Sequence, residues 1–220
     1  MKIERVCIPK FENVSLNERL EFPREEIDET PDFFGDYRDN LLKCAKDRLN
    51  LARWLTWEVQ TNKIERESAT GLRYAAKMYA AFLKLAEYPE QDFTFKIFDL
   101  PAVTWNGKGM LEAGYAEPEE WLDAYFLAVI TRDFESMDSL ANFPVEIMKQ
   151  SATKAGPVSY KLVEVFQAFH HRQDNYPSLL NQCMKMAVDQ GNDWALGIAM
   201  GYLETFAALT TDIGFDFNET

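Results

Sequence analysis

The residues that could carry catalysis in this chain are its acids and two histidines. The chain has 220 residues, with 36 Asp and Glu but only His170 and His171, which are neighbours. Adjacent residues on a helix point about 100° apart, so this pair cannot close together on one metal ion. Acid pairs such as Glu119 with Asp123 could serve a hydrolase or a metal, but their spacing does not make them converge on one site. The pattern favours structural histidines and solvated surface acids.

Recognised catalytic and cofactor motifs are missing from the sequence. It contains no GxSxG, HExxH or EF-hand pattern. Gly107-Lys108-Gly109 is similar to part of a phosphate loop. However, Ala102 stands where a Walker motif needs its first glycine, and Gly109 stands where it needs Ser or Thr. The sequence therefore predicts a protein that is not an enzyme and that needs no cofactor and no metal.

The net charge of −13 indicates what kind of partner the protein takes. Nucleic acids and anionic membranes are negatively charged as well, so we expect neither to bind the protein directly. A basic protein partner is favoured, because opposite charges accelerate association. The start of the chain lacks the apolar region of a secretory signal. The three cysteines, at positions 7, 44 and 183, are far apart and odd in number, which is typical of reduced thiols. We expect a cytoplasmic protein.

Two acidic clusters supply the candidate partner-binding residues. Nine acids and three arginines lie between residues 18 and 39, where two prolines and Gly35 interrupt any regular pattern. This composition predicts an irregular acidic arm over residues 1–35 rather than a long helix. The second cluster lies just before and after Pro118. The residues expected to face a partner are Glu25, Glu26, Asp28, Glu29, Asp32, Glu112, Glu117, Glu119 and Glu120. A purely solvated acidic loop is the alternative for the arm.

Helical periodicity dominates the rest of the chain and predicts one mainly α domain of packed helical hairpins. Apolar residues recur every three or four positions over residues 36–90, which predicts a pair of long helices. Pro118 suits the first turn of a further helix, and helical hairpins are expected over residues 118–210, before a tail at 211–220. Residues 91–117 are expected to form an extended insertion. Alternation after Phe93 predicts a short β-hairpin near 93–110, with Asn106-Gly107 as a type I′ turn.

A weak internal similarity appears at a spacing of 40 residues. Stacked helical hairpins of the HEAT or tetratricopeptide type produce such a spacing. The recurring residues are Phe126, Ala128, Arg132 and Leu140, which return as Phe166, Ala168, Arg172 and Leu180. Two partial copies are fewer than the three that a repeat array normally needs, so the similarity predicts paired helices rather than a solenoid.

A distinctive pattern runs from Trp121 to Pro144. A tryptophan is followed by a helix rich in aromatic residues and alanine, then by an Arg-Asp turn and a second helix that ends in a proline. The positions are Trp121, Ala124, Tyr125, Phe126, Ala128, Arg132, Asp133, Leu140 and Pro144. This pattern resembles immunity protein family 49, a family of all-α immunity proteins of bacterial polymorphic toxin systems. The resemblance covers residues 118–190.

The resemblance implies a non-catalytic protein that binds the toxin encoded beside it and blocks the active site of that toxin. The acidic charge favours a basic nuclease that acts in the cytoplasm as the toxin, with an NAD-consuming enzyme as the second choice. The rivals are a helical-repeat adaptor or chaperone, with exposed aromatic residues along a concave face, and a metal-dependent helical hydrolase. We expect Trp121 to be buried, and Arg132 and Asp133 to cap helices rather than contact a toxin.

Overall fold

The computed structural model describes residues 16–55 and 62–190, together with 197 and 201. Helices and one two-stranded sheet make up this part of the chain. The bounds are α1 Leu16–Asp28, α2 Thr30–Phe33, α3 Asn40–Leu55, α4 Asn62–Glu87, β1 Phe93–Phe95, β2 Val103–Trp105, α5 Met110–Ala113, α6 Pro118–Thr131, α7 Phe134–Ala141, α8 Val145–Gln150, α9 Pro157–His170 and α10 Tyr176–Asp189. None of the helices in the described ranges is long and apolar enough to cross a membrane. The prediction of a mainly α fold is confirmed.

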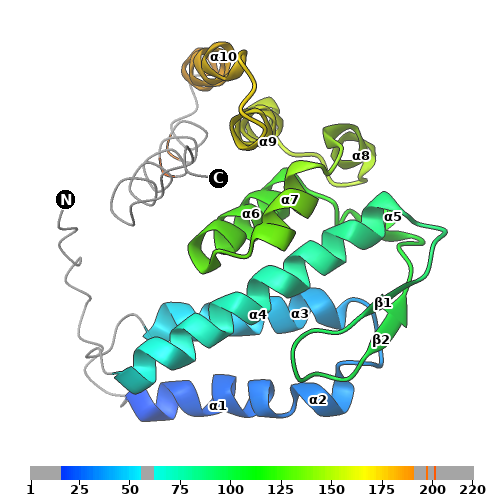
Figure 1. Ribbon diagram of the computed structural model, residues 1–220, viewed down its shortest axis with the longest axis vertical. Coiled ribbons are helices and arrows are strands. Elements are labelled where there is room, and N and C mark those ends of the chain that lie inside the picture. Colours follow the sequence, from blue (N-terminus) through cyan, green and yellow to red (C-terminus); the bar gives the residue numbers. More distant parts are fainter. Residues whose placement is uncertain (1–15, 56–61, 191–196, 198–200, 202–220) are drawn as a thin grey trace.

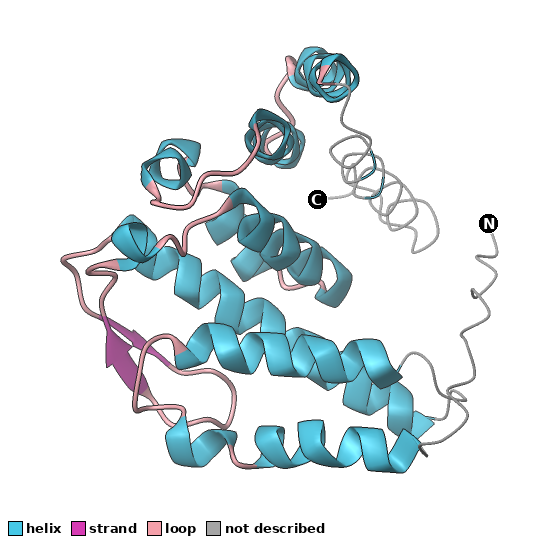
Figure 2. Ribbon diagram, turned by 180° about the vertical axis from the view of Figure 1, so that it is seen from behind, coloured by secondary structure: helices cyan, strands magenta, loops and turns pink. Residues whose placement is uncertain are grey.

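The helices are stacked along the long axis of the molecule, from α1 and α2 at one end to α10 at the other (Figure 1). Helix α4 packs against α3, α6 and α7, while α6 also packs against α9, and α9 against α10. The two strands lie at one edge of the stack (Figure 2). The predicted helical hairpins are thus confirmed as far as residue 189. The remainder of the range predicted to be helical lies almost wholly outside the described residues.

The prediction of an irregular arm is wrong for residues 16–33, which form α1 and α2. Pro23 lies inside α1, where its missing N–H and its ring normally cost a helix about 3 kcal/mol. Contacts with α3 offset this cost, because Leu20 is only 2 % exposed and packs against Leu51 of α3. Tertiary packing therefore overrides the local signals of proline and acidic residues that the prediction used. The part of the arm before residue 16 lies outside the described residues.

The predicted β-hairpin is present, but the prediction that Asn106-Gly107 forms its turn is wrong. Strands β1 and β2 are antiparallel, with Phe93 opposite Trp105, so the connecting loop is residues 96–102. The Asn-Gly pair follows the second strand instead. A Cβ atom on Gly107 would lie 1.7 Å from the carbonyl oxygen of Leu85, near the end of α4. Glycine is required here because two backbones approach closely, not because a hairpin turns.

Replacing Gly107 by Ala should destabilise the fold strongly. The added Cβ would overlap the backbone of Leu85, which cannot rotate away as a side chain can. Overpacking typically costs about 1–3 kcal/mol and sometimes more, so we expect the melting temperature to fall by about 5 °C or more. Thermal unfolding followed by circular dichroism measures this. The control is Gly35→Ala, whose nearest neighbour would be Val103 Cγ1 at 3.7 Å. Equal melting of the two variants would contradict the close approach.

The similarity at a spacing of 40 residues corresponds to a repeated structural unit. Arg132 after α6 and Arg172 after α9 both adopt the left-handed backbone conformation, with φ angles of 54° and 51°. In each turn the next residue donates its N–H back to the helix, to the carbonyl of Ala128 or of Ala168, at 2.9 Å. This is a common way for a helix to end before reversing direction. The predicted pairing of helices is confirmed, because the hairpins α6–α7 and α9–α10 share the same turn.

Candidate partner-binding surface

The first acidic cluster lies on an ordered helical surface, α1 and α2. The exposed members are Glu25, Asp28, Glu29 and Asp32. Glu26 is half-buried, and its carboxylate accepts a hydrogen bond from Lys43 Nζ of α3 at 3.3 Å. Since α1 packs on α3 through its apolar side, these carboxylates are held by a helix rather than by a loose arm. A surface that is ordered before binding loses less conformational entropy when a partner binds.

Two lysines on α3 link the first acidic cluster to the second. Lys43 pairs with Glu26 of α1 and, at 2.8 Å, with Asp47 of its own helix. Lys46 pairs with Glu120 of α6 at 2.8 Å. The two lysines are three residues apart on one helix and therefore neighbours on its surface. Half-exposed ion pairs of this kind add little stability, but they fix the acids of α1 and α6 on either side of α3.

We call the surface formed by Glu26, Asp47, Glu117 and Glu120, around Lys43 and Lys46, the α3 acidic face. We include Glu117 because it directly precedes α6 and is near enough to feel the charges of Glu120 and Lys46, while its carboxylate is hydrogen-bonded to Thr153. Burial raises the pKa of Glu117, and the neighbouring carboxylates of Glu119 and Glu120 raise it further. Carboxylates crowded in this way gain most from a cation brought by a partner. The structure thereby joins residues that lie more than 70 positions apart in the sequence.

Other members of the predicted set lie elsewhere. Glu112 is exposed on the short helix α5. Glu119 faces the interior, where its Oε1 accepts a hydrogen bond from Ser159 Oγ of α9 at 2.8 Å. Its Oε2 is buried and has no hydrogen-bond partner among the described residues. Glu119 therefore links α6 to α9. Partner binding by this second cluster stays a prediction for Glu112, Glu117, Glu119 and Glu120.

Trp121 is a core residue, as predicted. Its side chain is 0 % exposed, and its indole Nε1–H donates to the carbonyl oxygen of Leu140 in α7 at 2.8 Å. The indole also stacks on the ring of Tyr125, with ring centroids 4.9 Å apart and an interplanar angle of 7°. The hydrogen bond ties α6 to α7, while the stacked rings of Trp121 and Tyr125 both belong to α6.

The Arg-Asp turn caps helices, as predicted. Arg132 is exposed and ends α6. Asp133 begins α7, where its side chain accepts the backbone N–H of Ser136 at 3.3 Å, and it pairs with Lys77 of α4 at 2.8 Å. Burial opposes ionisation of Asp133, but the bonds from Lys77 and Ser136 prevail and lower its pKa. Pro144 directly precedes α8, which the sequence pattern did not predict.

The two histidines join α9 to α6 and α7. His170 Nε2 lies 2.9 Å from Asp138 Oδ1, and its Nδ1 lies 3.2 Å from the hydroxyl of Tyr125. A neutral ring that donates from Nε2 to the carboxylate and accepts the Tyr125 hydroxyl at Nδ1 satisfies both contacts. His171 Nε2 donates to the carbonyl oxygen of Ala141 at 3.2 Å. The expected structural role of the pair agrees with these contacts.

Stability should fall as the pH drops below about 6.5 because of His170. Burial lowers the pKa of His170, its contact with Asp138 raises it less, and the net shift is downward from 6.5. The folded state then binds fewer protons than the unfolded state, so this stability is complete above pH 6.5 and is lost as pH falls below it. Urea unfolding between pH 7 and pH 5 should show a steeper loss for the wild type than for His170→Gln.

The matched control for this pH dependence is His171→Gln, which leaves the contacts of His170 with Tyr125 and Asp138 in place. It should keep the pH dependence of the wild type. An unchanged slope in His170→Gln would show that other groups carry the pH dependence.

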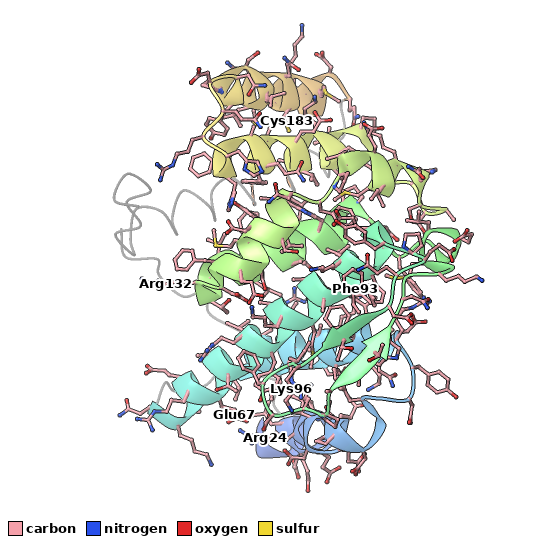
Figure 3. All side chains as sticks on the ribbon, turned by 45° about the vertical axis from the view of Figure 1, so that its right-hand side comes forward. Arg24, Glu67, Phe93, Lys96, Arg132 and Cys183 are labelled. Atoms are coloured by element: carbon pink, nitrogen blue, oxygen red, sulfur yellow. The ribbon has the colours of Figure 1, made fainter. Side chains whose placement is uncertain are left out.

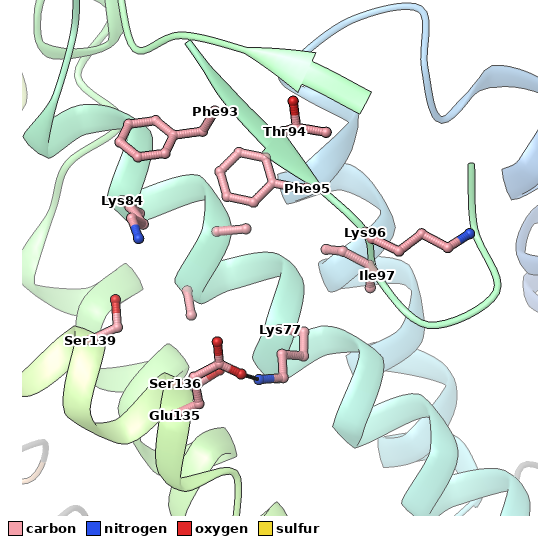
Figure 4. Close-up of a pocket in the computed structure, with 12 residues that line it drawn as sticks. Lys77, Lys84, Phe93, Thr94, Phe95, Lys96, Ile97, Glu135, Ser136 and Ser139 are labelled. Atoms are coloured by element: carbon pink, nitrogen blue, oxygen red, sulfur yellow. Dashed lines mark hydrogen bonds and ion pairs between the residues drawn. The ribbon is translucent and has the colours of Figure 1, made fainter. Parts of the chain in front are cut away.

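An open groove of about 390 Å³ lies between α4, β1 and α7 (Figure 4). Lys77 at its floor is paired with Glu135 at 2.8 Å, as the dashed line in Figure 4 shows. The ammonium of Lys84 lies 5.1 Å from the centre of the Phe93 ring. Lys96 extends away from the groove in the same view. Ser136 of the lining donates its hydroxyl to Asp133 Oδ2 at 2.6 Å, but this pair is part of the cap at the start of α7.

The described residues show little that suits a metal or a reactive thiol. They contain no group of three or more His, Cys, Asp or Glu side chains that could hold a metal ion. Cys44 and Cys183 are buried free thiols, and burial raises the pKa of both, that of Cys183 to about 11. Thiols with raised pKa values are poor nucleophiles.

Large exposed apolar side chains, which an adaptor would need along a concave face, are scattered in the described part of the chain. They are Tyr37, Tyr88, Phe98, Ile130, Phe134 and Val188. Since they lie on loops and helices from the loop before α3 to the end of α10, they give no specific support to the adaptor alternative.

The fold and its surface define a mainly α protein of stacked helical hairpins that carries an ordered acidic face. Residues 58–210 match the model of the family described as Immunity protein 49. The match spans more than half of the chain, and the chain belongs to this family. It is therefore an immunity protein, whose partner is a toxin. The resemblance predicted from Trp121 to Pro144 is confirmed. No curated protein and no solved structure matches the chain.

The position of the match separates the two acidic clusters. The family match begins at residue 58, after α3. The second cluster lies inside the matched residues, whereas the first cluster and the lysines of α3 lie before them. The α3 acidic face is thus built from both parts of the chain.

Proposed function

We propose that the protein binds its cognate toxin domain in the cytoplasm of the producing cell and blocks the toxin's active site without turnover of its own. Membership of the immunity protein 49 family carries this proposal. The favoured toxin is a basic nuclease. A nuclease must hold a phosphate backbone, so its active site is surrounded by cations. A cluster of carboxylates on a rigid helical surface can occupy such a site in place of the substrate.

The α3 acidic face is the surface best suited to this role. Its acids are fixed by Lys43 and Lys46, which reduces the entropy lost on binding. The ion pairs of Lys43 and Lys46 lie at the surface, where they are partly exposed to solvent. An arginine or lysine of the toxin can therefore reach the same carboxylates and compete with the two lysines. Charges at the rim of such an interface accelerate association, while buried contacts determine how slowly the complex dissociates.

The test uses the purified protein and the toxin domain encoded beside its gene. Cleavage of DNA and RNA is followed while the protein is titrated into the toxin. We expect cleavage to reach zero at one equivalent, and preloading the toxin with an uncleavable nucleic acid should slow binding of the protein. Inactivation at far less than one equivalent would instead indicate that the protein acts catalytically. A toxin that consumes NAD and leaves nucleic acids intact would contradict the nuclease assignment but not the inhibition.

A further inference from the structure

A second, larger pocket lies at the end of the molecule opposite α10, between α1, α3, α4 and the 96–102 loop. Its volume is about 660 Å³, which is within the range of small-molecule sites. Figure 3 shows Arg24 and Glu67, which line it, side by side between α1 and α4. None of the residues that define the α3 acidic face lines this pocket, and its lining on α4 and the 96–102 loop lies within the family match.

The pocket contains a buried arginine that lacks a carboxylate partner. Arg48 is 5 % exposed and lies on the apolar stripe of α3, one turn after Cys44. Its Nη1 donates to Thr30 Oγ1 at 3.2 Å and to the carbonyl oxygen of Cys44 at 3.4 Å. Among the described residues, no carboxylate forms an ion pair with it. Burial lowers the pKa of Arg48 and outweighs the attraction of Asp47 and Asp99, which lie near enough to act on its charge without pairing with it.

The remaining donors of Arg48 are free to hold a ligand. One face of the guanidinium lies over the ring of Tyr74, with its central carbon 5.1 Å from the ring centre. The Nε and Nη2 groups donate no hydrogen bond to a described residue. A guanidinium presents such groups as a planar fork that matches the two oxygens of a carboxylate or phosphate. A buried charge that is only partly compensated is costly, so a ligand that completes the compensation gains affinity.

The other charges around the pocket leave it slightly positive, although the chain as a whole is acidic. Arg24 is neutralised by Glu67, through two hydrogen bonds of 2.7 and 2.9 Å. Lys63 and Arg66 are exposed at the rim on α4, and neither forms an ion pair within the described part of the chain. The lining acids besides Glu67 are Asp28 and Asp99, and Asp99 accepts the hydroxyl of Tyr74. Four cations therefore face three acids.

We propose that this pocket binds a small organic anion. Its phosphate or carboxylate group lies on Arg48, with Lys63 and Arg66 completing the charge, and its apolar or ring portion packs beside Ile27 and Leu51. Because Arg48 is buried, its guanidinium is held in place and lies in a region of low dielectric constant. A hydrogen-bonded pair between this guanidinium and the anionic group of the ligand is therefore stronger than the same pair at the surface. The pocket volume exceeds what a single phosphate needs, which leaves room for an apolar portion of the ligand.

The test is isothermal titration of the full-length protein with phenyl phosphate and with inorganic phosphate, at constant ionic strength set with NaCl. Phenyl phosphate should bind at one site, about tenfold or more tightly than inorganic phosphate, because only its ring reaches the apolar lining. Arg48→Met should weaken binding of phenyl phosphate at least about tenfold. Without ligand, this variant should melt at the same temperature as the wild type or higher, since it removes a buried charge that no ion pair compensates.

A second variant keeps the test decisive if Arg48→Met does not fold. Lys63→Gln with Arg66→Gln changes only exposed side chains and should weaken binding about threefold or more. The control is Lys108→Gln with Lys185→Gln, which removes the same charge from exposed positions outside the pocket lining. Equal weakening in both double variants, or no binding of phenyl phosphate, would overturn the proposal. The proposal would also be overturned if the wild type bound neither phosphate compound and Arg48→Met lost binding to the toxin. Arg48 would then bind an acidic side chain of the toxin rather than a small anion.

Discussion

Trp121→Ala should lower the free energy of unfolding by about 3–5 kcal/mol, the range typical for truncating a fully buried tryptophan. Trp121 is 0 % exposed and stacks on Tyr125, so its removal leaves a cavity between α6 and α7. Its hydrogen bond to the carbonyl of Leu140 is lost as well. We expect the melting temperature to fall by about 10 °C or more. Guanidinium unfolding, followed by circular dichroism, measures the free energy.

Two further variants separate the contributions to this effect. Trp121→Phe keeps an aromatic ring beside Tyr125 but has no N–H for Leu140, so it should lose clearly less stability than the alanine variant. Tyr37→Ala truncates an aromatic side chain that is 73 % exposed and should change stability by less than about 0.5 kcal/mol. If Trp121→Ala were no more destabilising than Tyr37→Ala, the packing of α6 on α7 would differ from that described.

Most helices of this fold could be predicted because their signals are local. Pro118 and Pro157 occupy the first turns of α6 and α9, where the fixed φ of proline suits a helix and its missing N–H is not needed. The signals that failed depend on distant residues. The acids and Pro23 of α1 look irregular until Leu20 meets α3, and Gly107 looks like a turn residue until Leu85 approaches it.

The candidate surface could be predicted only in part, for the same reason. The carboxylates are visible as clusters in the sequence, but their meeting depends on Lys43 and Lys46, which lie on a helix outside both clusters.

The sequence analysis did not single out Arg48, which lines the second pocket. Its signal was present in the sequence, since Arg48 falls on the same helical stripe as Leu41, Ala45 and Ala52, all of which are buried. A charged residue in a buried stripe is uncommon and indicates a special role.

Reversing exposed acids of the first cluster should slow association with the toxin about tenfold or more. The variant combines Glu25→Lys, Glu29→Lys and Asp32→Lys, which all change exposed residues. Glu26 is left intact because it pairs with Lys43, and Asp28 is left intact because it lines the Arg48 pocket. Charges near an interface act mainly on the rate of encounter, so the dissociation rate should change less than about twofold. Stopped-flow association at several salt concentrations measures both the rate and its dependence on screening.

The matched control reverses three exposed acids far from the cluster: Glu90→Lys, Asp174→Lys and Asp189→Lys. Both variants gain the same net charge, so the long-range attraction to a basic toxin weakens equally in the two. Only the first variant removes charge next to the α3 acidic face, and since the Debye length is about 8 Å at physiological salt, only that loss persists there. At each salt concentration, the association rate of both variants is compared with that of the wild type. As salt rises, the control should approach the wild-type rate, while the first variant should remain slower than the wild type. If the two variants associate at the same rate at every salt concentration, net charge alone steers the toxin, and the first cluster is not part of the interface.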